Sequence, residues 1–328
     1  MPLTAHPSPR PPFSDATAHP LVAIIGPTGS GKSDLALEVA GIFAGEIVNC
    51  DSLQVFRYFD IGTAKLAADQ RRSIPHHLID VVDPDELFTA GAYARMARTA
   101  CAKISARGRF PIVVGGTGFY LRALLDGLFA GPTRDQGLRG RLAQREQRRA
   151  GSLHRLLSRF DPTAAAKIHP RDVPKVTRAL EVCLLTRRPV SELFREGREP
   201  LRGYRTLKIG LSPDREALYQ RLDVRCRQMF ECGLLEEVRR ILALGYPGSC
   251  KPFESHGYKQ VLQLLRNELT PKEALFYAQR NTRRYAKRQI TWFRRESGLE
   301  WLKGFGDDPA VRDAALARVR NFLDPAAS

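Results

Sequence analysis

The residues with the clearest potential for chemistry stand near the start of the chain, in the sequence GPTGSGKS. An apolar run at 21–25 precedes them, and the apolar positions of 34–43 suit an amphipathic helix. The pattern G-x-x-x-x-G-K-[ST], placed in a turn between a strand and a helix, binds phosphate through backbone N–H groups and the lysine side chain. The hydroxyl of its last residue, Ser or Thr, can bind Mg²⁺. We therefore predict a nucleotide or another diphosphate here, with Ser33 as a magnesium ligand. The predicted phosphate-binding residues are Gly26, Pro27, Thr28, Gly29, Ser30, Gly31, Lys32 and Ser33.

Two further segments are expected beside this phosphate loop. Asp51 follows a short candidate strand at 46–49, and the glycine-rich GGTG of 115–118 follows a buried strand at 110–114. The carboxyl ends of parallel strands open on the same edge of a sheet, so Asp51 should project beside the loop and either bind magnesium or accept a proton. No strand ends in the acidic residue usual in ATPases of this class, which argues against an ordinary ATPase.

A pair of arginines is a second candidate group for binding phosphate. A strand is expected at 206–211, followed by a helix with Ser212 as its N-cap and Pro213 as its first residue. Arg221 and Arg225 then lie four residues apart on one face. They could clamp a diphosphate from the side opposite Lys32 or form salt bridges, and both readings stay open.

The positive charge is unevenly distributed. The formal net charge is +17, and residues 132–203 contribute +9 (17 Lys and Arg against 8 Asp and Glu) while 271–297 contribute +6 (8 against 2). In the first region the pattern predicts short arginine-rich helices, including 136–150 and 173–184. In the second, a capping box at Thr270 and Glu273 opens a long helix whose arginines and lysines share one face. Localised charge of this kind favours a polyanionic partner.

These elements predict an α/β fold: a parallel sheet core like that of P-loop NTPases, with helices on both faces and an inserted all-helical domain. We expect a disordered tail at 1–20, a catalytic core at 21–131 and 204–303, a helical insertion at 132–203 that binds the polyanion, and a C-terminal segment at 304–328. The chain shows no signal peptide and no long apolar segment, so we expect a cytoplasmic protein that does not contact membranes. The six cysteines are expected to be reduced and mostly buried, and His76 and His77 to be structural.

Assembled in order, the segments resemble the tRNA dimethylallyltransferase family, or IPP transferases, from about Val22 to Arg295. The matching stretches are GPTGSGKS at 26–33, DSLQVFRYFDIGTAK at 51–65, PHHLID at 75–80, GGTGFYLRALLDG at 115–127, HPRDVPKVTRALEV at 169–182, GLLEEV at 233–238 and NTRRYAKRQITWFRR at 281–295. The family transfers a dimethylallyl group from dimethylallyl diphosphate to the exocyclic N6 of the adenosine 3′ to the anticodon, in tRNAs that read codons beginning with U.

The resemblance implies roles for individual residues. Asp51 becomes the base that assists the poorly nucleophilic amine, joined by Thr28, Lys32 and Thr117 as catalytic residues. The phosphate loop with Arg221 and Arg225 then holds the diphosphate leaving group, with Mg²⁺ as cofactor. The implied contacts to the tRNA anticodon stem-loop are Asp51, Ser52, Leu53, Gln54, Thr117, Arg139, Pro174, Lys175, Val176, Thr177, Arg178, Glu254, Ser255, His256, Gly257, Tyr258, Lys259, Lys287, Arg288, Gln289, Ile290, Thr291 and Trp292.

Two positions depart from the family pattern: Phe56 stands where tyrosine is frequent, and Ser255-His256 precedes Gly257 where an aliphatic residue is common. We expect the enzyme to act as a monomer. The alternatives are a prenyltransferase for free adenine nucleotides, which would not need the basic surfaces, and an RNA-associated P-loop ATPase or kinase. A protein that only binds RNA would leave Asp51 and both glycine-rich turns without a role.

Overall fold

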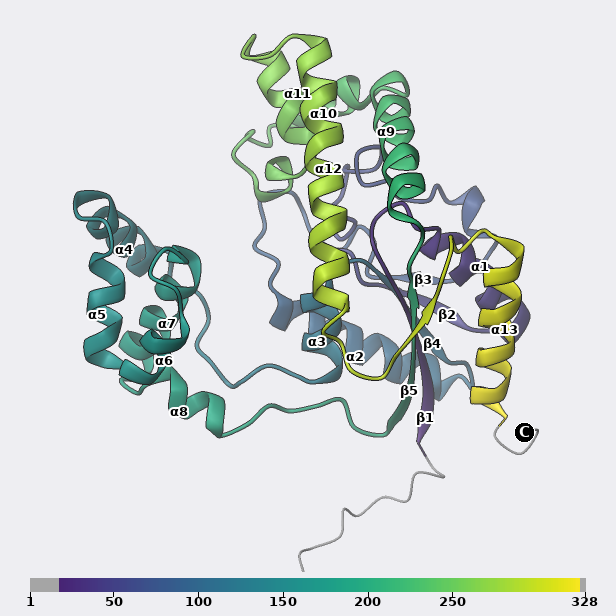
Figure 1. The fold of residues 1–328 in the computed structure, drawn as a ribbon, viewed down its shortest axis with the longest axis horizontal. Helices are drawn as coiled ribbons and strands as arrows, with labels where there is room; N and C mark the ends of the chain where they lie inside the picture. The colour runs from purple at the N-terminus through teal and green to yellow at the C-terminus, as the bar shows by residue number, and fades with distance from the viewer. Residues whose placement is uncertain (1–17, 325–328) are drawn as a thin grey trace, which may run out of the picture. The chain divides into compact units, whose positions relative to one another are not determined.

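The computed structural model describes residues 18–324 and contains one six-stranded parallel sheet (Figure 1). The strand order is β3-β2-β4-β1-β5-β6. The strands are β1 (His19–Ile25), β2 (Glu46–Asn49), β3 (His76–His77), β4 (Pro111–Gly115), β5 (Tyr204–Leu211) and β6 (Leu299–Leu302). β1 lies at the centre, with Ile24 opposite Val114 of β4 and Ile209 of β5. The predicted α/β fold with a parallel sheet is confirmed.

Helices cover both faces of this sheet (Figure 1). On one face, Leu35 of α1 (Lys32–Phe43) and Ala315 of α13 (Pro309–Leu323) pack in one apolar cluster with Ile24 and Ile209. On the other face, α2 (Ala90–Ala106) packs against β2 and β4, and α3 (Gly118–Leu125) follows β4. Every residue from Leu21 to Ile25 is fully buried, as expected for a central parallel strand covered on both sides.

A second group of helices extends from the sheet edge at which β1, β2 and β4 end (Figure 1). It consists of α9 (Arg215–Glu231), α10 (Leu234–Ala243), α11 (Tyr258–Leu265) and α12 (Pro271–Phe293). α9 packs on α12 through Leu218, Leu222 and Ala286. Phe59, from the segment after β2, packs with Tyr258 of α11, so this helical group also supports the segment that follows Asp51.

Two predicted helix starts can be compared with the structure. α12 begins as predicted, because Thr270 accepts a hydrogen bond from the Glu273 amide and the Glu273 carboxylate accepts one from the Thr270 amide. The predicted start of α9 is wrong by two residues. Asp214 is the N-cap, and its carboxylate accepts hydrogen bonds from the amides of Glu216 and Ala217, which a serine two residues earlier would not reach.

Residues 125–201 form a separate, all-helical unit. Its helices are α4 (Gln136–Arg148), α5 (Ser152–Phe160), α6 (Pro162–Lys167), α7 (Val173–Thr186) and α8 (Val190–Arg195). Leu142, Leu157, Val176 and Leu180 lie in its own apolar core. The boundaries observed differ from those predicted at 132 and 203, and the C-terminal segment with α13 belongs to the unit that contains the sheet.

The N-terminal prediction requires a correction. The sequence predicts a disordered tail through residue 20, but His19 and Pro20 belong to β1 because they pair with Tyr204 and Arg205 of β5. The rest of the predicted tail, residues 1–17, lies outside the described residues. All six cysteines are free and all but Cys232 are buried, which agrees with the prediction. Between residues 18 and 324, none of the helices is both long and apolar enough to cross a bilayer.

Candidate active site

The phosphate loop connects the end of β1 to the start of α1. Gly29 and Gly31 adopt positive φ angles of 78° and 80°, the left-handed conformation that glycine adopts without strain. A Cβ atom at Gly29 would lie 2.7 Å from a methyl carbon of Leu222, so α9 packs tightly against this turn. Backbone N–H groups at the N-terminus of a helix bind anions, and α1 supplies such a terminus here.

Lys32 folds back over this loop, and its Nζ donates a hydrogen bond of 2.7 Å to the carbonyl oxygen of Pro27. Burial lowers the pKa of Lys32 to about 8, although the nearby Asp51 carboxylate opposes the shift. The side chain is therefore mostly cationic at neutral pH. It has no acidic partner within salt-bridge distance among residues 18–324, so its charge is available to an anionic ligand.

Gln289 of α12 joins the two glycine-rich turns. Its Oε1 accepts a hydrogen bond from the Thr28 amide at 2.8 Å, and its Nε2 donates one to the Gly116 carbonyl oxygen, also at 2.8 Å. A Cβ atom at Gly116 would lie 2.1 Å from that amide nitrogen, so only glycine permits this approach. Gln289 was predicted to contact RNA, but it is buried and its amide is occupied within the protein. The only signal for this connection in the sequence is the residue's place on the inner face of the helix.

Asp51 stands directly beyond β2, at the sheet edge that was predicted for it. Its Oδ1 accepts a hydrogen bond from the Leu53 amide at 2.8 Å, while Asn49 accepts one from the Asp51 amide at 3.1 Å. The Asn49 side chain also donates to the carbonyl oxygen of Leu78 at 2.9 Å, which fixes the turn. Across the part of the chain that the structure describes, Oδ2 of Asp51 has no hydrogen-bond partner. One carboxylate oxygen is thus anchored while the other is free to accept a proton.

Thr117 holds the second glycine-rich turn against the first residues after Asp51. Its Oγ1 accepts a hydrogen bond from the Ser52 amide at 3.0 Å, and its own amide donates to the Cys50 carbonyl oxygen at 3.1 Å. A Cβ atom at Gly115 would lie only 2.1 Å from that carbonyl oxygen. The structure therefore brings Asp51, Ser52 and Thr117 together, with Thr117 supporting the turn that carries Asp51.

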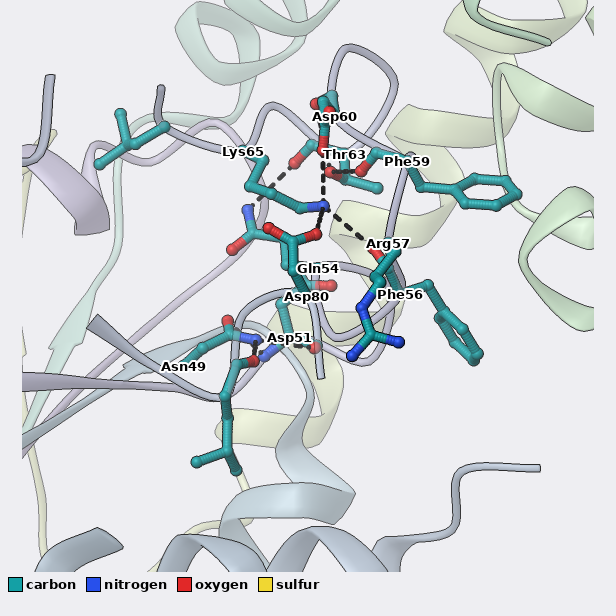
Figure 2. A network of polar contacts seen from close by, with 12 residues as sticks. Asn49, Asp51, Gln54, Phe56, Arg57, Phe59, Asp60, Thr63, Lys65 and Asp80 are labelled. Atoms are coloured by element: carbon teal, nitrogen blue, oxygen red, sulfur yellow. Dashed lines mark hydrogen bonds and ion pairs between the residues drawn. The ribbon is translucent and has the colours of Figure 1, made fainter. Parts of the chain in front are cut away.

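The segment after Asp51 is fixed by a polar network around Lys65 (Figure 2). Nζ of Lys65 lies 2.6 Å from both Asp60 Oδ1 and Asp80 Oδ1 and donates to the Phe56 carbonyl oxygen at 3.0 Å. The Lys65 side chain is only 3% exposed, so its charge is satisfied within the protein. Figure 2 also shows Gln54, whose Nε2 donates to the Thr63 carbonyl oxygen at 3.1 Å. Sequence reasoning missed this supporting role of Lys65, which is apparent only once the two aspartates are placed around it.

The two arginines of α9 have different environments. Arg221 forms a salt bridge with Asp307 at 2.8 Å and lies over the ring of Phe305. Arg225 points into the cavities that Lys32 and Asp51 also line. Burial lowers its pKa, and in the described part of the chain it has no salt-bridge partner. Of the two readings left open, salt bridging describes Arg221, while Arg225 is available to a ligand.

Three adjoining cavities connect these residues. The outermost is lined by Gly29, Gly31, Lys32, Ser33, Asp34, Arg221, Val224, Arg225 and Gln228. A polar cavity beside it shares Lys32, Ser33, Asp34 and Arg225 and adds Thr28 and Asp51. The third, mainly apolar, shares Thr28, Asp51, Thr63 and Arg225 and is otherwise lined by Leu53, Gly62, Leu222, Cys226, Met229, Phe230, Leu234, His256, Gly257, Ala278, Thr282 and Tyr285. Phosphate-binding groups therefore lie at one end, apolar side chains at the other, and Thr28 and Asp51 between them.

The outer side of α12 and the turn that follows it carry a row of exposed cations: Arg284, Lys287, Arg288, Arg294 and Arg295. We call these five residues the cationic row. None of them forms a salt bridge with any residue between 18 and 324. A shallow pocket beside them is lined by Arg122, Lys287, Arg288, Thr291, Trp292 and Arg295, with the Arg122 guanidinium 4.7 Å from the centre of the Trp292 ring. The row and this pocket together present positive charge, the flat Trp292 ring and the Thr291 hydroxyl, and groups of these kinds bind nucleic-acid phosphates and bases.

Within the helical unit, two residues predicted to contact RNA bind a buried carboxylate. Nε of Arg139 lies 2.8 Å from Glu181 Oε1, and one Arg178 nitrogen lies 2.7 Å from Glu181 Oε2. Burial alone would raise the pKa of Glu181, but these hydrogen bonds prevail and lower it to about 2. The other arginines of α4, Arg141, Arg145 and Arg148, are exposed. The charge of this unit is therefore partly structural.

The remaining predicted RNA contacts divide by burial. Val176, Gly257 and Tyr258 are buried, and the Tyr258 hydroxyl donates to Glu237 at 2.5 Å and accepts from the Gly62 amide at 3.0 Å. Lys175 is exposed but forms a salt bridge with Asp172 at 2.5 Å. Nδ1 of His76 donates a hydrogen bond to the Ile74 carbonyl oxygen and Nε2 of His77 donates one to the Glu46 carboxylate, which agrees with their predicted structural roles.

Comparisons with known proteins agree with this geometry. The family model described as IPP transferase matches residues 54–296. A tRNA dimethylallyltransferase of Solibacter usitatus is 72% identical over 93% of this chain and 99% of its own length, and one of Koribacter versatilis is 55% identical over 92% and 98%. Among solved structures, the tRNA isopentenylpyrophosphate transferase of Bacillus halodurans is 37% identical with a TM-score of 0.68, covering 93% of this chain and 95% of that one. A eukaryotic dimethylallyltransferase, solved while acting on tRNA, has a TM-score of 0.79 at 30% identity and covers 94% of this chain and 80% of that one.

Proposed function

The chain belongs to the IPP transferase family and is an enzyme that prenylates tRNA, and from this premise we propose how its site performs the reaction. The donor is dimethylallyl diphosphate, and the acceptor is N6 of the adenosine 3′ to the anticodon in tRNAs that read codons beginning with U. The nitrogen attacks the allylic carbon, and the carbon–oxygen bond breaks with its electron pair passing to the diphosphate. As the carbon–nitrogen bond forms, the nitrogen gives one proton to Asp51. We place this reaction in the cytoplasm.

The diphosphate end of the donor fits the outer and polar cavities. The turn with Gly29 and Gly31, the start of α1, Lys32 and Arg225 all surround this space. Negative charge grows on the diphosphate as the allylic bond breaks, and fixed donors aimed at that charge lower the barrier. Lys32 and Arg225 are suited to this task because neither has an acidic partner among the described residues. The phosphate loop thus stabilises a leaving group.

A magnesium ion fits the polar groups at this end. The residues described contain no cluster of three His, Cys, Asp or Glu side chains that would hold a metal without a substrate. Magnesium commonly binds one or two protein oxygens together with substrate phosphates. We propose that Ser33, with Asp34 beside it in the same cavities, would hold the ion. When bound, it would neutralise charge on the departing diphosphate.

Asp51 is the proposed base. The amine lone pair of adenine is delocalised into the ring, so removal of a proton as the new bond forms makes attack easier. The anchored Oδ1 fixes the direction of the carboxylate, and Oδ2 has no hydrogen-bond partner within the described chain. The observation that carries the proposal is that Asp51 and Thr28 line both the cavity with the phosphate-binding groups and the apolar cavity.

The test is transfer of label from radioactive dimethylallyl diphosphate in the presence of magnesium. Purified protein is offered an unmodified tRNA with adenosine 3′ to the anticodon, the same tRNA with guanosine there, or AMP. We expect label only in the adenosine-containing tRNA. Label in AMP would show that the free nucleotide is the acceptor, and ATP turnover without transfer would favour the P-loop ATPase reading.

A further inference from the structure

His256 lies in the short segment between the 3₁₀ turn η3 (Lys251–Glu254) and α11, and it lines the apolar cavity that also contains Asp51 and Thr28. Its ring packs against the Tyr285 ring, with centroids 5.4 Å apart and planes tilted by 57°. Within residues 18–324 neither ring nitrogen has a hydrogen-bond partner. The side chain is half-buried, so this polar group faces the cavity without being satisfied by the protein.

Several other polar side chains around the same cavity are already occupied. Thr63 Oγ1 donates to the Phe59 carbonyl oxygen at 2.7 Å, and Thr282 Oγ1 donates to that of Ala278 at 2.8 Å. The Cys226 thiol in turn contacts Thr282 at 3.6 Å. The proposed reaction already uses Asp51 for the amine proton and Arg225 for the diphosphate. His256 therefore remains as a polar group of this cavity without a role.

The charge state of His256 restricts what it can bind. Burial and the positive charge of Arg288 lower its pKa to about 4. The other charged or titratable residues that line its cavity are Asp51, Arg225, Cys226 and Tyr285, and burial raises the pKa of both Cys226 and Tyr285. At neutral pH the imidazole is therefore uncharged and carries one N–H donor. A neutral donor suits a heteroaromatic base better than a phosphate.

The target adenine offers acceptors that match this donor. When its amine points at Asp51, ring nitrogens N1 and N7 flank that amine, and each can accept a hydrogen bond. We propose that His256 is a positioning residue that donates a hydrogen bond to one of these two ring nitrogens and so orients the target base for attack. This role rests on the proposed function.

A double-mutant cycle between the side chain and the base tests this assignment. The enzyme variants are wild type, His256→Leu and His256→Asn, whose amide can still donate. The substrates are anticodon stem-loops with adenosine, 1-deazaadenosine or 7-deazaadenosine at the target position. The measurements are kcat/KM for each stem-loop and KM for dimethylallyl diphosphate, with thermal unfolding as a check on folding.

We expect wild type to use one of the two deaza substrates about threefold to tenfold less well than adenosine, the size of one neutral hydrogen bond. His256→Leu should lose a similar factor on adenosine and no longer distinguish that analogue. His256→Asn should recover part of the discrimination, and KM for the diphosphate should not change. Equal discrimination by wild type and His256→Leu against both analogues would overturn the role of His256. Failure of wild type to label the adenosine stem-loop would instead overturn the proposed function.

Discussion

Two regions of the molecule hold charged side chains wholly or partly out of water, and they differ in whether those charges are paired. In the helical unit, Glu181 is fully buried and is bound by Arg139 and Arg178. In the cavity beside the phosphate loop, Lys32, Arg225 and Asp51 lie near one another, yet none forms a salt bridge with any described residue. A buried charge without a partner is costly, whereas a paired one can be tolerated. The difference indicates that Glu181 and its two arginines stabilise the fold, whereas the charged residues beside the phosphate loop bind a charged substrate.

Replacing the free carboxylate should have the largest effect on activity. Asp51→Asn keeps the shape and the acceptor for the Leu53 amide but cannot take a proton, so we expect kcat to fall about 1,000-fold, within the range for general-base catalysis. The affinity for tRNA should persist, because the fold and the cationic row are unchanged. Single-turnover transfer and filter binding measure the two quantities. Comparable rates for mutant and wild type would remove Asp51 as the base.

Removing the charge of Glu181 should lower the free energy of unfolding of the helical unit. Glu181→Gln leaves Arg139 and Arg178 half-buried without their counter-charge, and we expect a loss of about 3 kcal/mol in the free energy of unfolding of the helical unit. Urea unfolding followed by hydrogen exchange in α4 and α7 measures it. The matched control is Glu192→Gln, since the Glu192 carboxylate is 47% exposed in its pair with Arg188 and surface pairs contribute little.

The ion pairs of Glu181 also predict that the free energy of unfolding of the helical unit depends on pH. The pKa of Glu181 is about 2 in the folded protein and about 4.3 in an unfolded chain. Because the folded pKa is the lower one, the stabilisation is complete above about pH 4.5 and is lost as the pH falls toward 2. In Glu181→Gln this component should be absent. Equal acid sensitivity of wild type and variant would show that other carboxylates determine it.

The same contrast explains how far the site could be predicted from the sequence. The glycine pattern located Lys32, and the rule for parallel strands placed Asp51 beside it, because both depend on local chemistry and on sheet topology. The partners of arginines depend on which distant residues fold against them. Arg139 with Glu181 and Arg221 with Asp307 are separated by 42 and 86 positions, and no local pattern reveals them. The roles of Gln289 and Lys65 were missed for the same reason, since each joins segments that only the tertiary fold brings together.

The two arginines of α9 allow a matched comparison within one helix. Arg225→Gln removes an unpaired cation from the proposed diphosphate site, so we expect KM for dimethylallyl diphosphate to rise about tenfold to 100-fold, the range for charge-assisted hydrogen bonds. Arg221→Gln should raise it about threefold at most, because Asp307 already occupies that guanidinium. Steady-state kinetics with saturating tRNA measures both. Equal effects would mean that the Arg221–Asp307 pair opens when the donor binds.

The smallest expected change concerns the unpaired charges at the surface. Arg284 and Arg288 are exposed and have no salt bridge among residues 18–324, as Lys32 and Arg225 have none in the cavity. If RNA phosphates are their partners, Arg284→Glu with Arg288→Glu should weaken tRNA binding about tenfold near physiological salt. The slope of log K against log salt should become shallower by about one unit for each phosphate that the variant no longer binds.

The control for this last experiment is Arg320→Glu, an exposed arginine on α13 that changes net charge by the same amount per residue. It should leave the slope unchanged, because a general reduction in charge acts at long range and is screened, whereas counterion release needs direct binding of the phosphates. An unchanged slope in the double variant would make the cationic row a solvated helix face. The exposed arginines of α4 would then be the next candidates for binding tRNA, since Arg141, Arg145 and Arg148, unlike Arg139, are not held by Glu181.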